Sequence, residues 1–194
     1  MTARTRSSRR ESSGGLNRPV AGWISALLLI AIALGVVWLY RSVRFGAIVS
    51  ESMEPTLQAG DYYMIRIDAY RREGPQHGDV VVTKNPDADE ERELLVKRVV
   101  AVGGDSVAVM EGRVWLNGHL VDEPYLRDQQ GVRERPVYGV VPEAHVILLG
   151  DNRNASEDSR DFGAVPADKI IGRVTAVLLP WKHRRSLDAP APPE

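Results

Sequence analysis

The sequence predicts a mostly β protein: a domain built on an antiparallel β-sheet or partly open barrel, preceded by one transmembrane helix. Three observations predict this class. A single uncharged apolar run lies at Trp23–Tyr40. From Arg44 onward, short segments rich in Val, Ile and Leu alternate with turn residues, which is typical of strands. The stretch "VWLNGHLV" places Asn117-Gly118 between apolar residues, which is the strongest short-range signal of a β-hairpin.

The first 40 residues divide into a polar tail and the apolar run. Residues 1–22 carry five arginines against one acid, Glu11, so we expect a disordered basic tail. Residues 23–40 approach the about 20 residues that span a bilayer, and aromatic side chains lie at both ends, as expected at a lipid interface. The alternatives are a buried core helix and a cleavable signal peptide, whose apolar region is usually shorter and which needs a cleavage site that we do not find. The arginine excess predicts a cytoplasmic N-terminus and an extracytoplasmic remainder.

The rest of the chain reads as one β domain followed by a short tail. We expect the domain to cover 45–179, long enough to bury a core, and a flexible Pro/Ala-rich tail to cover 180–194. The acidic stretch Asn85–Glu93 is expected to be a solvated loop, with an acidic metal site as the alternative.

Composition limits the chemistry. The 194 residues have a formal net charge of −1, so nothing favours nucleic-acid binding. The absence of cysteine excludes disulfides, thiol catalysis and cysteine-ligated metals. We expect no cofactor, no metal and no nucleic-acid partner. The four histidines form no HExxH pair and accompany no Gly-x-Ser-x-Gly motif, so each is expected to be structural or exposed.

Lys97 lies inside the apolar segment "LLVKRVVAV", beside Arg98. Strand alternation puts the two side chains on opposite faces, so one of them must point to the more buried side. Burial without a counter-charge lowers the pKa of a lysine, and a neutral lysine can act as the general base for a serine. Arginine cannot, because it stays protonated. The alternative is a lysine that snorkels from a strand edge.

Two polar stretches could supply such a serine. "VSESMEPTLQAGD", Val49 to Asp61, follows the apolar run, and its serines could cap a helical turn or include a nucleophile. "LLGDNRNASEDSRDFG", Leu148 to Gly163, fails as a calcium loop because Arg153 occupies a ligand position. It is either an Asx-rich turn or a pinned loop that offers Ser156 or Ser159 to a neighbouring site.

These elements together resemble type I bacterial signal peptidases, the membrane-bound serine proteases that remove signal peptides. The resemblance covers nearly all of Trp23 to Leu179. It rests on the anchor followed, in order, by "SESMEPTL", "GDYYMI", "GDVVV", "KRVVAVGGD", "LNGHLVDEPYL" and "GDNRNASEDSRDFG". Each short motif alone is weak, but the full ordered set is specific.

The resemblance implies a Ser-Lys dyad. Ser52 matches the nucleophile, Lys97 the general base, Ser156 the serine that orients the lysine amine, and Ser50 the oxyanion-hole serine that acts with the Ser52 backbone N–H. It also implies an ion pair of Asp158 with Arg160 that supports the site, and a loop braced by Asp151 and Arg153.

The resemblance further implies shallow apolar pockets for small residues at the cut site. They would be lined by Ile48, Met53, Leu57, Tyr63, Val82, Leu95 and Val96. An extended substrate could add to the edges near Ile48–Ser50 and Leu95–Lys97. The expected partners are signal peptides of preproteins and membrane lipid, for a protein that works as a monomer near the translocation machinery.

The sequence departs from the family pattern in two places. Glu51 lies between the two serines, where glycine is common, and Asn154-Ala155 replaces the usual Asp-Asn before Ser156. Two other functions remain open. One is a Ser-Lys peptidase with another dedicated substrate; self-cleaving repressors and plasmid-transfer peptidases resemble this fold too, but usually lack the anchor or carry a DNA-binding domain. The other is a non-enzymatic, membrane-tethered β domain that binds peptides.

Overall fold

The computed structural model describes residues 18–86, 93–126 and 137–187, in two units, Met1–Tyr40 and Arg41–Glu194. The expectations for residues 1–17 and 188–194, and for most of the acidic stretch Asn85–Glu93, lie outside the described residues.

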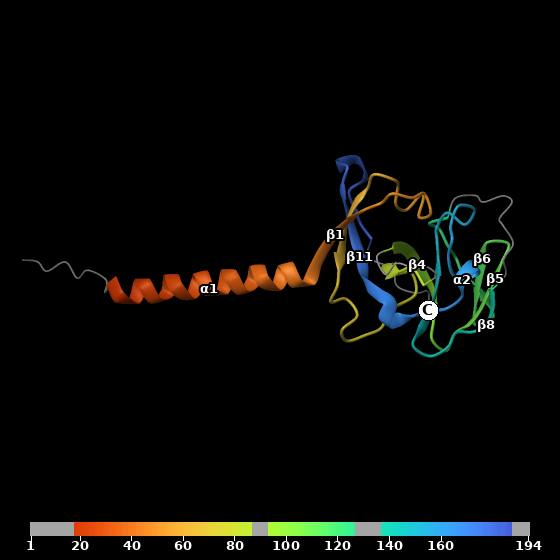
Figure 1. The fold of residues 1–194 in the computed structure, drawn as a ribbon, viewed down its shortest axis with the longest axis horizontal. Helices are drawn as coiled ribbons and strands as arrows, with labels where there is room; N and C mark the ends of the chain where they lie inside the picture. The colour runs from red at the N-terminus through yellow and green to blue at the C-terminus, as the bar shows by residue number, and fades with distance from the viewer. Residues whose placement is uncertain (1–17, 87–92, 127–136, 188–194) are drawn as a thin grey trace, which may run out of the picture. The chain divides into compact units, whose positions relative to one another are not determined.

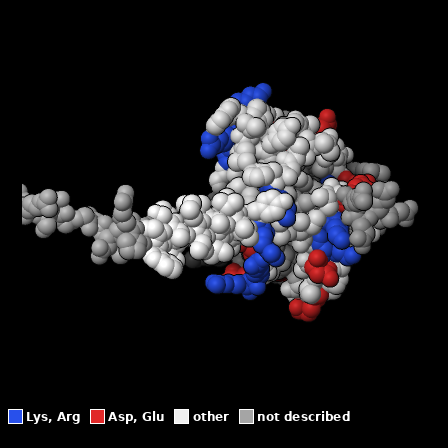
Figure 2. Space-filling model, turned by 60° about the vertical axis from the view of Figure 1, so that its left-hand side comes forward, with Lys and Arg blue, Asp and Glu red and all other residues white. Residues whose placement is uncertain are grey.

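The apolar run forms a single helix, α1 (Arg18–Ser42). The helix begins inside the stretch expected to be a tail and runs past the expected anchor of 23–40. Its segment Gly22–Ser42 is 21 residues long and apolar enough to cross a membrane. At 1.5 Å per residue this is about 32 Å, close to the thickness of a hydrocarbon core. Figure 2 shows its visible surface free of charged side chains along the middle of the helix.

Antiparallel pairing builds a large sheet from the second unit. Its path is β1-β2-β11-β3-β4-β9-β10, and β12 pairs with β11. The strands are β1 (Val43–Ala47), β2 (Tyr62–Arg66), β3 (Val80–Lys84), β4 (Leu94–Val102), β9 (His145–Leu149), β10 (Val165–Pro166), β11 (Ile170–Leu179) and β12 (Arg185–Ser186). This order brings the start of the domain, β1 and β2, beside its last long strand, β11.

A second sheet has the order β7-β6-β5-β8 and lies at the opposite end of this unit from β1 and β11 (Figure 1). Its strands are β5 (Ser106–Met110), β6 (Arg113–Leu116), β7 (His119–Leu120) and β8 (Val137–Val140). The Asn-Gly hairpin is present between β6 and β7, with Asn117 at φ 52° and Gly118 at φ 87°. Positive φ at both central residues is what a type I′ turn requires, and it explains the Asn-Gly pair.

The described helices of this unit are short: α2 (Ser159–Phe162), and the 3₁₀ turns η1 (Ala167–Lys169) and η2 (Trp181–His183). The prediction of a mostly β, antiparallel fold with one N-terminal apolar helix is confirmed. The C-terminal stretch differs from the expected flexible tail in its described part. Residues 181–186 form η2 and β12, because Arg185 and Ser186 pair with Val177 and Ala176 of β11.

One core cluster lies directly under the turn that follows β1. It joins side chains of that turn to those of the large sheet: Ile48, Met53, Leu57, Tyr63, Ile65, Val80, Val82, Val174 and Val177. Fully burying one such side chain stabilises a fold by roughly 1.5–3 kcal/mol. Hydrophobic packing against the large sheet therefore holds the turn in place.

Candidate active site

Ser52 lies in the turn between β1 and β2, and hydrogen bonds close this turn at its base. The Ile48 N–H donates to the Asp61 carbonyl at 2.8 Å, and the Gly60 N–H donates to the Ile48 carbonyl at 2.8 Å. Inside the turn the Leu57 N–H donates to the Met53 carbonyl at 2.8 Å, which makes one helical turn directly after Ser52. Ser52 is buried at the edge of a pocket.

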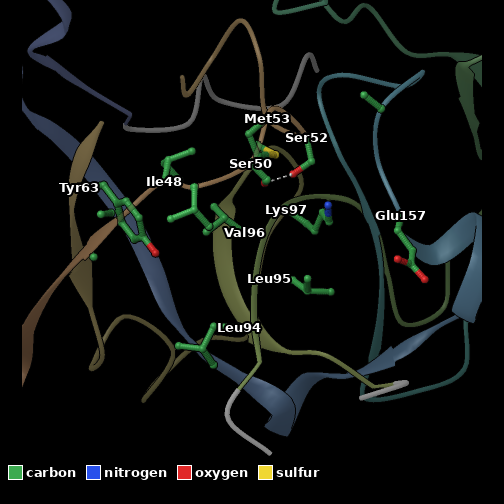
Figure 3. Close-up of a pocket in the computed structure, with 14 residues that line it drawn as sticks. Ile48, Ser50, Ser52, Met53, Tyr63, Leu94, Leu95, Val96, Lys97 and Glu157 are labelled. Atoms are coloured by element: carbon green, nitrogen blue, oxygen red, sulfur yellow. Dashed lines mark hydrogen bonds between the residues drawn. The ribbon is translucent and has the colours of Figure 1, made fainter. Parts of the chain in front are cut away.

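The two serines of this turn are in contact. The hydroxyls of Ser50 and Ser52 are 3.2 Å apart, within hydrogen-bond distance, and Figure 3 shows this contact at the rim of the pocket. Ser50 is exposed, whereas Ser52 is buried. Their spacing of two residues therefore puts both hydroxyls at one place.

Lys97 enters the same pocket from β4. Its side chain is 3% exposed, and its Nζ donates to the Ser156 hydroxyl at 3.1 Å. Among the described residues no carboxylate forms an ion pair with this amine. Burial lowers the pKa of Lys97 below its ordinary value of 10.5, although the nearby charge of Asp158 opposes the shift. This is the change that a lysine needs in order to accept a proton.

A chain of polar groups leads away from Lys97. The Ser156 hydroxyl contributes to the lowered pKa of the Asp158 carboxyl. Arg160 in turn donates to Asp158 through Nε at 2.8 Å and through Nη2 at 2.9 Å. Burial alone would raise the pKa of Asp158, but Arg160, the Gly150 N–H and Ser156 together lower it. Asp158 also caps α2. The hydroxyl that receives the Lys97 N–H thus belongs to the same loop as a buried carboxylate that Arg160 and the Gly150 N–H hold in place.

The other serine of this loop has a different place. The Ser159 hydroxyl accepts from the backbone N–H of Leu148 at 2.9 Å and is fully buried. Of the two serines that the sequence offered, Ser156 therefore contacts Lys97, while Ser159 ties α2 to β9.

The pocket has a volume of about 480 Å³. Figure 3 shows Ser52 and Lys97 facing it, with apolar side chains along one side and Glu157 at the other. Five of the residues expected to bind substrate line it: Ile48, Met53, Tyr63, Leu95 and Val96. Leu57 and Val82 do not line it. Both are fully buried in the core cluster, where they pack behind the lining residues.

On the other face of β4, Arg98 is buried against Asp151. The guanidinium donates through Nε at 2.8 Å to one carboxylate oxygen and through Nη2 at 2.7 Å to the other. Nη1 donates to the Gly78 carbonyl at 2.8 Å, and the guanidinium stacks on Tyr125 at 3.8 Å. Burial alone would lower the pKa of Arg98, but Asp151 raises it above its ordinary value.

Arg153 makes a second buried ion pair from the same loop. Its Nη2 lies 2.5 Å from a carboxylate oxygen of Glu123, and its Nε donates to the Gly150 carbonyl at 3.1 Å. Nη1 also donates to the Gly112 carbonyl. Loop 150–158 is therefore anchored at Asp151, Arg153 and Asp158, while Asn154 and Ala155 are exposed.

Two residues of this loop escaped the sequence interpretation. A Cβ on Gly150 would lie 2.2 Å from the Ser156 hydroxyl and 2.5 Å from the Ser52 carbonyl, so only glycine allows this close approach. The Asn152 N–H donates to the Ser52 carbonyl at 3.0 Å, and its Nδ2 donates to the Glu51 carbonyl at 3.2 Å. These residues join the two polar stretches. The only sequence signal for them was their place next to Asp151.

None of the four histidines lines the pocket. His77 contacts Asp105 at 2.7 Å, His183 contacts Asp61 at 2.6 Å, and His145 hydrogen-bonds to the Glu143 carbonyl, while His119 is exposed. Among the residues described, no group of three or more His, Asp or Glu side chains could hold a metal ion.

The arrangement suits acyl transfer: one pocket holds a serine hydroxyl, a second hydroxyl beside it, and a buried amine with a lowered pKa. The family model described as "Signal peptidase, peptidase S26" matches residues 21–181. The chain belongs to this family, and membership supports a peptidase that acts on signal peptides.

Particular relatives agree with this assignment. A probable signal peptidase I-2 from Synechocystis sp. is 37% identical over 147 residues, which is 74% of this chain and 66% of the relative. A signal peptidase IB from Staphylococcus aureus is 32% identical over 187 residues, which is 87% of this chain and 94% of the relative. The chain is also similar to the crystal structure of a signal peptidase I from Enterococcus faecalis, with a TM-score of 0.46 and 24% identity over 53% of this chain and 98% of that one.

Proposed function

We propose that the chain is a membrane-anchored serine endopeptidase that cleaves signal peptides from translocated preproteins, with Ser52 as nucleophile and Lys97 as general base. The observation that carries the proposal is the buried Lys97 amine, which shares a pocket with Ser52 and has a lowered pKa. Structural lysines keep a counter-charge or reach solvent; a general base needs the opposite environment.

In the first half of the reaction, the Ser52 Oγ attacks the scissile carbonyl and Lys97 Nζ takes the hydroxyl proton. The tetrahedral intermediate then collapses: the peptide C–N bond breaks, and the Lys97 ammonium returns its proton to the leaving amine. An acyl-enzyme on Ser52 remains. In the second half, Lys97 takes a proton from water and the hydroxide attacks the ester carbonyl. The C–O bond to Ser52 then breaks, the Lys97 ammonium returns the proton to Ser52 Oγ, and the new carboxyl end of the signal peptide is released.

The oxyanion would be held by the Ser50 hydroxyl and the Ser52 backbone N–H. The distance of 3.2 Å between the Ser50 and Ser52 hydroxyls supports this role, and another rotamer of Ser50 would direct its hydroxyl to the oxyanion. Removing one such donor typically lowers the rate by about 10²–10³.

Substrate binding by strand addition is supported by the pairing of β4. β9 pairs with β4 only from Arg98 onward, whereas β3 already pairs from Leu94. Among the described strands, the second edge of Leu94–Lys97 therefore has no partner, and an extended peptide could pair there. The apolar lining beside this edge favours small apolar residues before the cut.

The remaining parts of the proposal concern location. Helix α1 would anchor the protein in the cell membrane with the N-terminus in the cytoplasm and the β domain outside. Signal peptides emerging from the translocation machinery are then its substrates. We propose that it works as a monomer, since the described catalytic groups all come from one chain.

The test is processing of a preprotein by the purified full chain in detergent. Ser52→Ala and Lys97→Ala should each abolish cleavage while the protein still inserts into membranes. Cleavage retained by either variant contradicts the mechanism. Labelling with a serine-reactive peptide mimic separates the enzyme from a tethered peptide-binding domain, which would not be labelled at Ser52. A panel of signal peptides and other peptides separates signal peptide cleavage from another dedicated substrate.

A further inference from the structure

A segment far from the pocket in sequence grips the turn that carries Ser52. The segment is Pro180–Leu187, which contains η2 and β12, and we call it the C-terminal clamp. It contacts the turn through two side chains, His183 and Arg185. Neither residue belongs to the dyad or to the pocket lining described above.

The first contact is made at Asp61, at the base of the turn. Asp61 is 1% exposed; one carboxylate oxygen accepts from the Gln58 N–H at 3.0 Å, and the other lies 2.6 Å from His183 Nδ1. The imidazole can donate this hydrogen bond from Nδ1, because a carboxylate oxygen is an acceptor. Asp61 is also the residue whose carbonyl closes the turn on Ile48, so His183 holds the closing point itself.

The second contact is made on the helical turn that follows Ser52. Arg185 Nη2 donates to the Thr56 carbonyl and lies 3.5 Å from the Pro55 carbonyl. These carbonyls come three and four residues after Ser52. A guanidinium keeps its charge at any working pH and presents several donors, so it can hold both oxygens at once.

The clamp is itself fixed to the large sheet. Arg185 and Ser186 pair with Val177 and Ala176 of β11, and the Leu187 N–H donates to the Thr175 carbonyl at 2.8 Å. The Leu187 side chain packs against the core cluster that contains Met53 and Leu57. The clamp is therefore fixed to the sheet and can hold the Ser52 turn in place.

The turn is thus held from two directions. Asn152 binds the Ser52 and Glu51 carbonyls from the catalytic loop, while His183 and Arg185 bind the base and the far side of the turn. We propose that His183 and Arg185 are positioning residues, which set the distance between Ser52 and Lys97 by clamping the turn. The predicted effect on kcat rests on the proposed function, whereas the predicted effect on the conformation of the turn does not.

The test compares His183→Ala, His183→Asn and Lys182→Ala with wild type, as full chains in detergent. Lys182 is the adjacent exposed residue and serves as control. Two measurements are made: kcat and KM for a signal peptide substrate, and hydrogen exchange in the peptide covering residues 48–61. Since a misplacement of about 1 Å can lower a rate about 10²-fold, His183→Ala should lower kcat by about tenfold to hundredfold and leave KM within about threefold.

His183→Ala should also speed exchange in 48–61. His183→Asn should restore both values in large part, because the asparagine Nδ2 can take the place of Nδ1 as donor. If His183→Ala does not fold, Arg185→Gln gives the same comparison from an exposed site. Unchanged kcat and unchanged exchange overturn the inference. So does a lower melting temperature with unchanged kcat, which would show a structural role alone.

The two proposals fail separately. If wild type neither cleaves the peptide nor is labelled at Ser52, the proposed function is wrong, and exchange alone then decides on the clamp. If wild type cleaves and the variants match it in kcat and exchange, the clamp is wrong and the proposed function stands.

Discussion

Lys97 and Arg98 are neighbours on β4, both are buried, and their environments differ completely. Lys97 is 3% exposed and bonds only to a neutral hydroxyl among the described residues; Arg98 is 6% exposed and is paired at two points with Asp151. The pKa of Lys97 is lowered by burial, while the pKa of Arg98 is raised by its carboxylate partner. One residue step thus separates an amine that can lose its proton from a cation that cannot.

The difference between the two side chains shows which of them lowers the stability of the fold. A buried ion pair such as Arg98–Asp151 is balanced by its hydrogen bonds, and it fixes the loop that supplies Ser156. The buried Lys97 amine, which has no ion-pair partner among the described residues, lowers stability at neutral pH. Such a cost is expected at a functional site. The Arg98 face should therefore control stability and the Lys97 face activity.

The largest effect is expected for Lys97→Met, which removes the amine but keeps the volume. Activity should fall by about 10⁴-fold or more, since loss of one member of such a unit removes its whole effect. Stability should not fall. An amine whose pKa is lower in the folded state binds fewer protons there, so it reduces stability at pH values below its ordinary 10.5. A melting temperature below that of wild type at pH 7 would contradict this account.

Arg98→Met should act in the opposite way. It removes the Arg98 guanidinium from the buried Asp151 carboxylate, which costs about 3–5 kcal/mol of unfolding free energy. Thermal or denaturant unfolding measures this loss, and the folded fraction should retain substantial activity. The double variant Arg98→Met with Asp151→Asn is the control, because removing both charges should recover part of the stability. No recovery would show that the pair is not the cause.

Ser156→Ala and Ser159→Ala sharpen the comparison within one loop. Ser156→Ala removes the hydroxyl that holds Lys97, so kcat should fall by about 10²-fold with little change in stability. Ser159→Ala leaves the buried Leu148 N–H without an acceptor and should cost about 1–3 kcal/mol of stability instead. Steady-state kinetics and thermal unfolding of both variants distinguish the roles; similar profiles for the two would refute the division.

The effect expected for Gly150→Ala is no larger than that of Ser156→Ala. The added Cβ would lie 2.5 Å from the Ser52 carbonyl, so the turn that carries Ser52 and loop 150–158 must move apart. Contacts this short require the two segments to separate by up to about 1 Å, which should lower kcat by about tenfold to hundredfold, with KM nearly unchanged. Gly74→Ala is the matched control, because a Cβ there meets nothing within 4 Å. Full activity of Gly150→Ala would show that the approach of the two segments is not required.

Much of this molecule could be predicted from the sequence because the signals are local. The Asn117-Gly118 pair specifies its own turn, and the apolar run specifies its helix. Strand alternation also predicted that Lys97 and Arg98 point to opposite faces. It left open which face is buried, because burial of both depends on what packs on each side of β4.

The remainder depends on contacts between distant segments. Asp151 meets Arg98 across 53 residues and His183 meets Asp61 across 122, and both depend on strand order that local patterns do not encode. The same applies to Gly150, whose need for glycine comes from the Ser52 carbonyl rather than from its own turn. The segment 181–186 had a tail-like composition, yet its residues Arg185 and Ser186 pair with β11 because the sheet offers an edge there.

The pH dependence of kcat/KM for a signal peptide substrate tests the central claim most directly. For the free enzyme, this profile reports the essential base. If Lys97 is that base, kcat/KM must rise with pH as the ammonium loses its proton, and the rise must have its midpoint below the ordinary lysine value of 10.5. A profile that is flat from acid to alkaline pH, or a midpoint at or above 10.5, would contradict the assignment.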